Sequence, residues 1–250
     1  MSRESERAAS MRIGRIQTCV LLLVLAACRA PPGPRVPAAS APPPVAGVEL
    51  YQVDAEHSQL TLRVYREGPL AALGHNLVIA VHGLEGSVHW HPDPARCSVA
   101  VRFAVAQLGV DEPELRAAAG PDFTTVVNEA ARAGTQHNLL GPRLLDAEHY
   151  PEITLVSEAV SGTAAEPRIA LRVYVAGHDA LLDVPVQLQR DASGLRASGE
   201  LELRQTALGL TPFSVMLGAL RVADTFFVHF DIRARPAVVA RRDGRPGASG

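Results

Sequence analysis

The chain has 250 residues, a hydrophobic content of 47% and a formal net charge of -2 at pH 7. A charge this close to zero gives no indication of nucleic-acid binding. Every basic residue apart from histidine is an arginine. Lysine nucleophiles, lysine Schiff bases and P-loop phosphate sites are therefore excluded.

The amino-terminal segment has the composition of an export signal. Arg12 and Arg15 form a positive region before a short apolar run at residues 19–27. This run is far below the roughly 20 residues that a membrane-spanning helix needs. It ends in "LAAC", which resembles the bacterial lipobox, whose cysteine is acylated and becomes the new amino terminus. We expect residues 1–27 to be a lipoprotein signal peptide. The alternative is a plain signal peptide followed by a chance cysteine, and either Met1 or Met11 is the start.

Cys28 is the residue that the lipobox resemblance assigns to lipid attachment. Stable anchoring needs more than one acyl chain, and bacterial lipoproteins typically carry three. Residue 29 is an arginine and not the aspartate that often retains lipoproteins at the inner membrane. We therefore expect a lipid-anchored protein of the bacterial envelope, at the outer membrane and facing the periplasm. Residues 28–47 are rich in Pro and Ala and predict an extended tether.

The folded domain is expected at residues 48–235, where apolar and polar residues alternate with the period of half-buried strands. "QLTLRVY" places Leu60, Leu62 and Val64 on one face. The runs "SVAVRFAV", "IALRVYVA", "DVPVQLQR", "ELELRQ" and "FFVHFDIRA" repeat the pattern, and the turn signals "HPDPAR", "AGHD" and "DASG" separate strands. Seven or eight such strands predict an all-β antiparallel barrel or sandwich. Residues 236–250 are rich in Arg, Gly and Pro and are expected to be a disordered tail.

A short helical insert is expected between residues 111 and 145. Asp111 is a candidate helix cap, and Pro113 stands where proline is tolerated at a helix start. "DFTTVVNEAARAG" spaces Phe123 and Val126 on one helical stripe and ends at Gly134. The insert is expected to cover one end of the barrel or to pack on its flank.

Histidines are the main candidates for ligand chemistry. His89 and His91 in "HWH" share one strand face, which is a spacing suited to zinc or copper. His82 has the opposite parity and would not complete a site, so no metal site is expected. His75 and His137 are either polar groups near a ligand head group or loop histidines with local hydrogen bonds.

The polar groups do not predict catalysis. Asp54, His57 and Ser58 are too close along the chain to converge as a triad, and no nucleophile-elbow motif is present. Arg204 is expected to face solvent together with the neighbouring glutamates. Cys97 lies in a strand pattern and is expected to be either a buried apolar side chain or a free thiol. We therefore expect neither catalytic residues nor a resident cofactor.

Four motifs, in order, carry a resemblance to a known family. "YQVDAEHSQLTLRVY" (residues 51–65) is similar to the opening strands of the YceI-like, polyisoprenoid-binding family. "LLGPRLLDAEHYPEITLVSEAV" resembles its middle motif, "LRQTALGLTPFS" its late motif with Arg204 and Gly209, and "LRVADTFFVHFDIRA" its closing strand. The middle motif matches through Leu145, Asp146, Tyr150, Pro151, Ile153 and Ser157. The chain departs from the family at "ALGHNLVIAVHGLEGSV" and "VAGHDALLDVPVQL", so the identity of the ligand does not carry over.

The resemblance implies an antiparallel, lipocalin-like β-barrel with an apolar tunnel for an isoprenoid chain, such as a polyprenyl or quinone-type lipid. A barrel of about eight strands holds either packed side chains or one slim ligand. The residues that we expect to line the tunnel are Phe103, Leu155, Leu171, Val173, Val186, Phe226, Val228 and Phe230.

Two functions from different classes remain open. The first is non-enzymatic binding, sequestration or transport of an amphiphilic isoprenoid-type lipid. The second is a tethered envelope interaction or stress-response module whose barrel interior is fully packed. The sequence decides neither the lipid, nor a partner protein, nor the oligomeric state.

Overall fold

The computed structural model describes residues 47–237. The expected signal peptide, Cys28, nearly all of the tether and most of the expected tail lie outside these residues. The described residues form thirteen strands and two α-helices, joined by short 3-10 turns. The strands are β1 (Glu49–Val53), β2 (Gln59–Glu67), β3 (Leu77–Val81), β4 (Glu85–Trp90), β5 (Ser98–Ala104), β6 (Leu108–Val110), β7 (Glu152–Gly162), β8 (Pro167–Val175), β9 (His178–Pro185), β10 (Gln187–Asp191), β11 (Gly194–Arg204), β12 (Ser214–Val215) and β13 (Leu220–Pro236).

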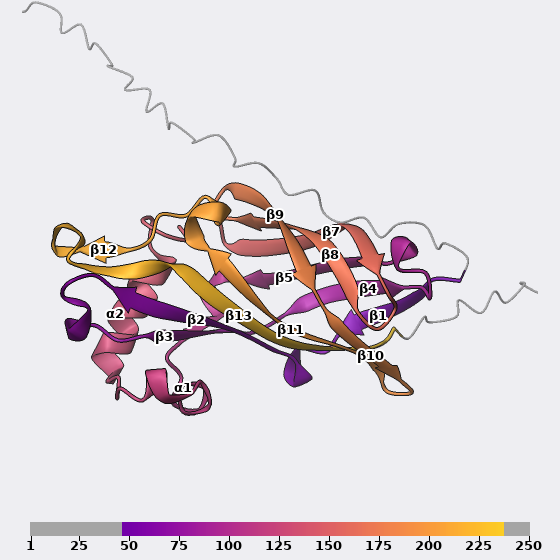
Figure 1. Ribbon diagram of the computed structural model, residues 1–250, viewed down its shortest axis with the longest axis horizontal. Coiled ribbons are helices and arrows are strands. Elements are labelled where there is room, and N and C mark those ends of the chain that lie inside the picture. The colour runs from indigo at the N-terminus through magenta and orange to yellow at the C-terminus, as the bar shows by residue number, and fades with distance from the viewer. Residues whose placement is uncertain (1–46, 238–250) are drawn as a thin grey trace, which may run out of the picture. The chain divides into compact units, whose positions relative to one another are not determined.

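The long strand β13 organises the sheet (Figure 1). β11 pairs with it along one edge, from Leu195 opposite Ala234 to Arg204 opposite Thr225. On its other edge β2 pairs with the first part and β1 with the end. From β1 the pairing continues through β4, β5, β7 and β8 to β9, and every pair is antiparallel. The expectation of an antiparallel all-β fold is confirmed.

Two strands change neighbours, and this wraps the sheet around an interior. β5 pairs with β4, whereas its continuation β6 pairs with β3. β9 pairs with β8, whereas its continuation β10 pairs with β11. Gly199 of β11 lies so close to β9 that an added Cβ would be 3.0 Å from the carbonyl oxygen of Pro185. Each neighbour change divides one extended run into two strands, which accounts for two of the strands beyond the seven or eight expected.

The alternation of side chains along the strands is as the sequence predicts. On β13 Phe226 and Val228 line the cavity, whereas the intervening Phe227 does not and packs edge-on against Tyr65 of β2. The two-residue turn between Asp191 and Gly194 joins β10 to β11. Pro236 is part of β13, so the first residue of the expected tail belongs to the sheet.

The helical insert differs from the prediction in its boundaries. α1 covers Pro113–Ala118 and α2 covers Glu129–Leu140, whereas Phe123 lies in a 3-10 turn. The expected helix from Phe123 to Gly134 is wrong because Asn128 starts a new helix by accepting a hydrogen bond from the N–H of Ala131 at 2.9 Å. Val126 is consequently 93% exposed, and Gly134 lies inside α2 instead of ending it.

Asp111 has a different role from the expected helix cap. Glu112 occupies the cap position of α1, and Asp111 is buried in a left-handed backbone conformation with a φ of 52°. Its carboxylate accepts hydrogen bonds from the backbone N–H of Val78 and from the guanidinium of Arg116. The carboxylate that the sequence pattern predicts as a local helix cap therefore binds Val78 and Arg116 instead.

The two ends of the domain are built differently. α1, α2 and β12 lie at one end in Figure 1, and the β10–β11 turn lies at the other. At the β10 end, Tyr51, Trp90, Leu195 and Ala234 form a small buried cluster. The guanidinium of Arg190 lies 4.0 Å from the ring centroid of Trp90 and covers this cluster.

Neither helix in the described part of the chain combines the length and the hydropathy that a bilayer-spanning segment requires.

Candidate functional site

The interior of the barrel contains an elongated cavity of about 520 Å³. Its walls include Val215 of β12 at one end and Leu188 of β10 at the other, so it extends along most of the domain. The fourteen steps from Leu220 to Ala234, which both line it, span at most roughly 48 Å of extended strand. The volume lies within the roughly 300–1,000 Å³ that small-molecule sites occupy. The barrel interior is therefore not fully packed, in contrast to the second of the two functions considered from the sequence.

The eight side chains expected from the sequence all lie on the wall of this cavity. They are Phe103 of β5, Leu155 of β7, Leu171 and Val173 of β8, Val186 between β9 and β10, and Phe226, Val228 and Phe230 of β13. Seven of them converge because each occupies the apolar parity of its strand, and Val186 follows directly after β9. Their role as ligand contacts stays a prediction.

The middle of the cavity is almost entirely apolar. Leu62, Leu201 and Leu203 complete the wall between β2 and β11, and Leu139 contributes from α2. Gln205 is a buried polar group on this wall, and its amide donates to the carbonyl oxygen of Ala223 at 2.7 Å. An apolar wall of this kind favours a hydrocarbon chain, because burial of apolar surface stabilises by roughly 25 cal/mol per Å².

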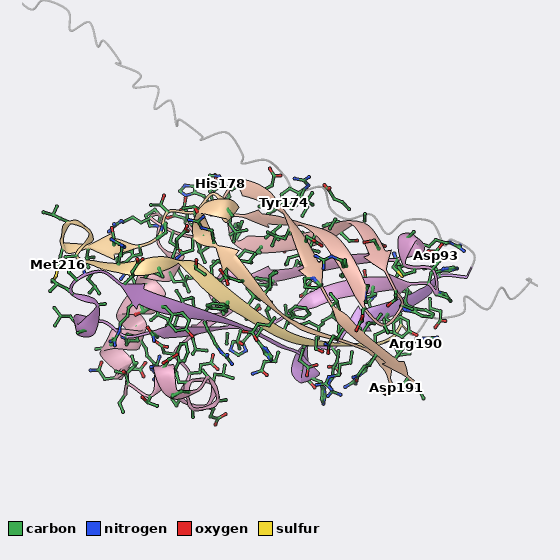
Figure 2. The ribbon with its side chains drawn as sticks, viewed as in Figure 1. Asp93, Tyr174, His178, Arg190, Asp191 and Met216 are labelled. Atoms are coloured by element: carbon green, nitrogen blue, oxygen red, sulfur yellow. The ribbon has the colours of Figure 1, made fainter. Side chains whose placement is uncertain are left out.

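Polar side chains lie mainly at the ends of the cavity. At the α2 end they are Arg66, His75, Thr135, Asn138 and Arg221. Figure 2 marks the two ends with Met216, next to β12, and with Asp93 and Arg190 at the opposite end. The shape and polarity thus suit a long molecule with an apolar chain and a polar group at its end.

Among the polar residues on the cavity wall, His75 is held by a network of buried hydrogen bonds through Asp111. Its Nε2 lies 2.8 Å from Oδ2 of Asp111, whose side chain is fully buried. Oδ1 of the same carboxylate accepts from Arg116 Nη1 at 2.5 Å and from the N–H of Val78 at 2.9 Å. His137, the other histidine that the sequence offers as a head-group contact, is exposed on α2 and is not part of the cavity wall. The pairing with Asp111 is a long-range contact that the sequence does not signal.

Cys97 is half-buried, and it lines the cavity near Trp90. Its Sγ lies 3.2 Å from both the backbone N and the carbonyl oxygen of His91. Burial raises the pKa of the Cys97 thiol. Because the thiolate is the reactive form, the thiol is weakly nucleophilic at neutral pH.

The metal candidate is not assembled in the structure. His91 lies on the cavity wall and uses both ring nitrogens locally, one with the N–H of Asp93 and the other with Arg96. His89 contacts the hydroxyl of Ser98 at 3.2 Å. Within residues 47–237 no three His, Cys, Asp or Glu side chains are grouped so that they could hold a metal ion.

The apparent triad is also explained by local structure. His57 pairs with Asp54 at 3.0 Å, and the Ser58 hydroxyl donates to the backbone oxygen of Asp54 at 2.7 Å. The Ser58 hydroxyl therefore faces the backbone and not the imidazole. Arg204 pairs with Asp224 at 3.0 Å on the outer surface, as the strand parity predicts.

The solved structures that are similar to this chain include two with TM-scores above 0.5. The crystal structure of BcnA from Burkholderia cenocepacia has a TM-score of 0.54 at 17% sequence identity, covering 72% of this chain and 98% of that chain. A polyisoprenoid binding domain from Saccharophagus degradans, implicated in plant cell wall breakdown, has a TM-score of 0.51 at 11% identity, covering 75% of this chain and 98% of its own. These similarities show the fold.

No curated protein matches the sequence. The family comparison is decisive, because the model of the YceI-like domain matches residues 51–234, which is well over half of the chain. The match begins at β1 and ends in β13, and thus includes every strand that lines the cavity. The protein belongs to the YceI-like domain family.

Proposed function

We propose that this domain binds, sequesters or transports one amphiphilic isoprenoid-type lipid, such as a polyprenyl or quinone-type molecule. The single observation that carries the proposal is the elongated apolar cavity of about 520 Å³. A chain that enters it exchanges contact with water for contact with aliphatic and aromatic side chains, which is favourable in proportion to the apolar area buried. The polyisoprenoid binding domain from Saccharophagus degradans has the same fold, which agrees with this proposal.

Binding is the whole mechanism under this proposal, and no bond is made or broken. The acidic and imidazole groups that the sequence offered as a triad form a local pair, Asp54 with His57, instead of converging with a nucleophile on one reacting position. Catalysis normally needs a nucleophile, a base and an orienting group within hydrogen-bond reach of one another.

Membrane attachment is a second part of the proposal and rests on the sequence. Acylation of Cys28 within "LAAC" would anchor the protein to the bacterial envelope, at the outer membrane and facing the periplasm. Residues 28–47 would then hold the domain away from the bilayer and let the cavity take up or release its lipid.

Native mass spectrometry of the protein purified from a bacterial envelope fraction, followed by lipid extraction, tests the binding. We expect a stoichiometric adduct that extracts as a prenyl chain. A protein that carries no adduct and also excludes added polyprenols and quinones would contradict the proposal and favour a tethered interaction module.

A matched pair of variants connects binding to the cavity. Leu171→Trp fills part of the cavity, whereas Ala170→Trp places the same side chain on the opposite face of β8. We expect Leu171→Trp to lose the adduct and Ala170→Trp to keep it. Equal loss in both variants, with folded far-ultraviolet circular dichroism spectra, would place the lipid outside the cavity.

A further inference from the structure

The cavity contains one polar group whose orientation is set by buried charges. His75 lies on the cavity wall at the α2 end, and its side chain is 18% exposed. Its Nε2 contacts Oδ2 of Asp111 at 2.8 Å. An ionised carboxylate accepts hydrogen bonds and does not donate, so Nε2 is the protonated nitrogen of this contact.

Asp111 is itself held in place from three sides. Its backbone N–H donates to the carbonyl oxygen of Val78 at 2.8 Å, and the Val78 N–H returns a bond to Oδ1 at 2.9 Å. Arg116 pairs with the same oxygen and also donates to backbone oxygens of Asn76 (2.7 Å), Phe123 (2.9 Å) and Thr125 (3.0 Å). The carboxylate has little freedom to move, and a group with this support holds the imidazole in one orientation.

The other ring nitrogen of His75, Nδ1, has no hydrogen-bond partner within residues 47–237. In a neutral ring that is protonated at Nε2, Nδ1 carries a lone pair and accepts a hydrogen bond. An acceptor group on a ligand would find no proton at Nδ1, whereas a hydroxyl group would donate its own proton to the Nδ1 lone pair.

The arginines at the same end of the cavity already have partners. Arg66 donates to the carbonyl oxygen of Gly74, and Arg221 pairs with Glu67 at 2.9 Å. A phosphate head group would have to displace these contacts or compete with Glu67. Among uncharged head groups, the lone pair on Nδ1 therefore favours one with an O–H donor.

We propose that Nδ1 of His75 accepts a hydrogen bond from the hydroxyl of the bound lipid, so that the domain selects an isoprenoid alcohol or phenol over a lipid without an O–H group. This inference rests on the proposed function. It adds a head-group site and a chemical class of ligand to the apolar cavity.

Binding of geranylgeraniol and of its methyl ether to the full chain tests the inference. Isothermal titration calorimetry measures both affinities, because Trp90, the only tryptophan of the chain, lies at the other end of the cavity from His75 and a geranylgeranyl chain is much shorter than the domain. A neutral hydrogen bond contributes about 1 kcal/mol net, so we expect the alcohol to bind about five-fold more tightly than the ether. His75→Phe should bring this ratio close to one. His137→Phe, the same change on the exposed face of α2, should leave the ratio unchanged.

The possible results separate the two proposals. If neither probe binds the wild-type protein, the proposed function fails and this inference fails with it. If both probes bind with equal affinity, or if His75→Phe keeps the five-fold ratio, the cavity binds lipid and only the inference is overturned.

A measurement on the wild-type protein covers the case in which His75→Phe does not fold. In a ¹⁵N spectrum of the imidazoles, the Nδ1 resonance of His75 should shift when geranylgeraniol is added and stay in place when the methyl ether is added. Equal shifts with the two probes would refute a hydrogen bond to the hydroxyl.

Discussion

The ion pair between Arg116 and Asp111 allows the sharpest prediction about stability. The two side chains are 6% and 0% exposed, and Arg116 makes four hydrogen bonds that tie the start of β3 and α1 to residues 121–125. Arg116→Met removes all four bonds and leaves the buried carboxylate with only the Val78 N–H and His75. Breaking a buried pair from one side costs about 3–5 kcal/mol, because an uncompensated charge remains in the interior.

Thermal unfolding followed by circular dichroism measures this cost. For a domain of about 150–250 residues, each 1 kcal/mol lowers Tm by roughly 2–4 °C, so Arg116→Met should lower Tm by roughly 6–20 °C. Arg196 pairs with Asp231 on the outer surface, where a salt bridge contributes about 0–1 kcal/mol, so Arg196→Met should lower Tm by no more than roughly 4 °C.

A double variant separates the charge from the lost packing. Asp111→Asn removes the carboxylate charge and keeps a side chain that tolerates the left-handed backbone. If the isolated charge causes the loss, the double variant Asp111→Asn, Arg116→Met should be more stable than Arg116→Met alone. A double variant that is less stable than Arg116→Met would refute the reasoning, and so would an Arg116→Met protein with the Tm of the wild type.

Three further predictions concern single residues. Gly134→Ala in the interior of α2, where an added Cβ meets nothing within 4 Å, should raise the free energy of unfolding by about 0.5–1 kcal/mol. Gly209→Ala, with a φ of 77° and a histidine ring 2.5 Å from the added Cβ, should lower it by at least about 1–2 kcal/mol. Urea denaturation measures both, and a stabilised Gly209→Ala protein would contradict the geometry. Cys97 should react more slowly with iodoacetamide than a free cysteine at pH 7, because burial raises the pKa of its thiol. A lipid bound in the cavity should slow the alkylation further. Mass spectrometry of the alkylated protein measures both rates, and an unchanged rate with lipid would place the ligand away from Cys97. The hydrogen bond to Asp146 raises the pKa of His149 above its usual 6.5, so the small stabilisation from this pair is fully present below about pH 6.5 and disappears as the pH rises through the raised pKa. The Tm difference between wild type and His149→Gln should therefore shrink from pH 6 to pH 9. A Tm difference that grows with pH would show the opposite linkage.

Much of the fold could be predicted from local pattern. The alternation in "IALRVYVA" places Ile169, Leu171, Val173 and Val175 on one side of β8, and all four line the cavity. Side-chain parity in a strand depends only on the extended backbone, so it is readable without knowledge of the neighbours. The eight expected lining residues were placed on the cavity wall for the same reason.

The insert could not be predicted with the same accuracy. The spacing of Phe123 and Val126 fits a helix, but Phe123 is buried in a 3-10 turn, where its own carbonyl oxygen accepts a hydrogen bond from Arg116, and Val126 is exposed. Here a tertiary contact of the backbone outweighs a weak helical periodicity. Asp111 is a similar case, because its partners Val78 and Arg116 come from two separate elements.

By itself the sequence determined the class of fold, the face of each strand and the absence of lysine chemistry, because these depend on residue type and on local backbone geometry. The tertiary structure decided that the interior is hollow, because a void depends on how far apart the walls lie once β5 and β9 change neighbours. It also decided that His75 and not His137 faces that void, because Asp111, thirty-six positions away along the chain, holds the His75 ring.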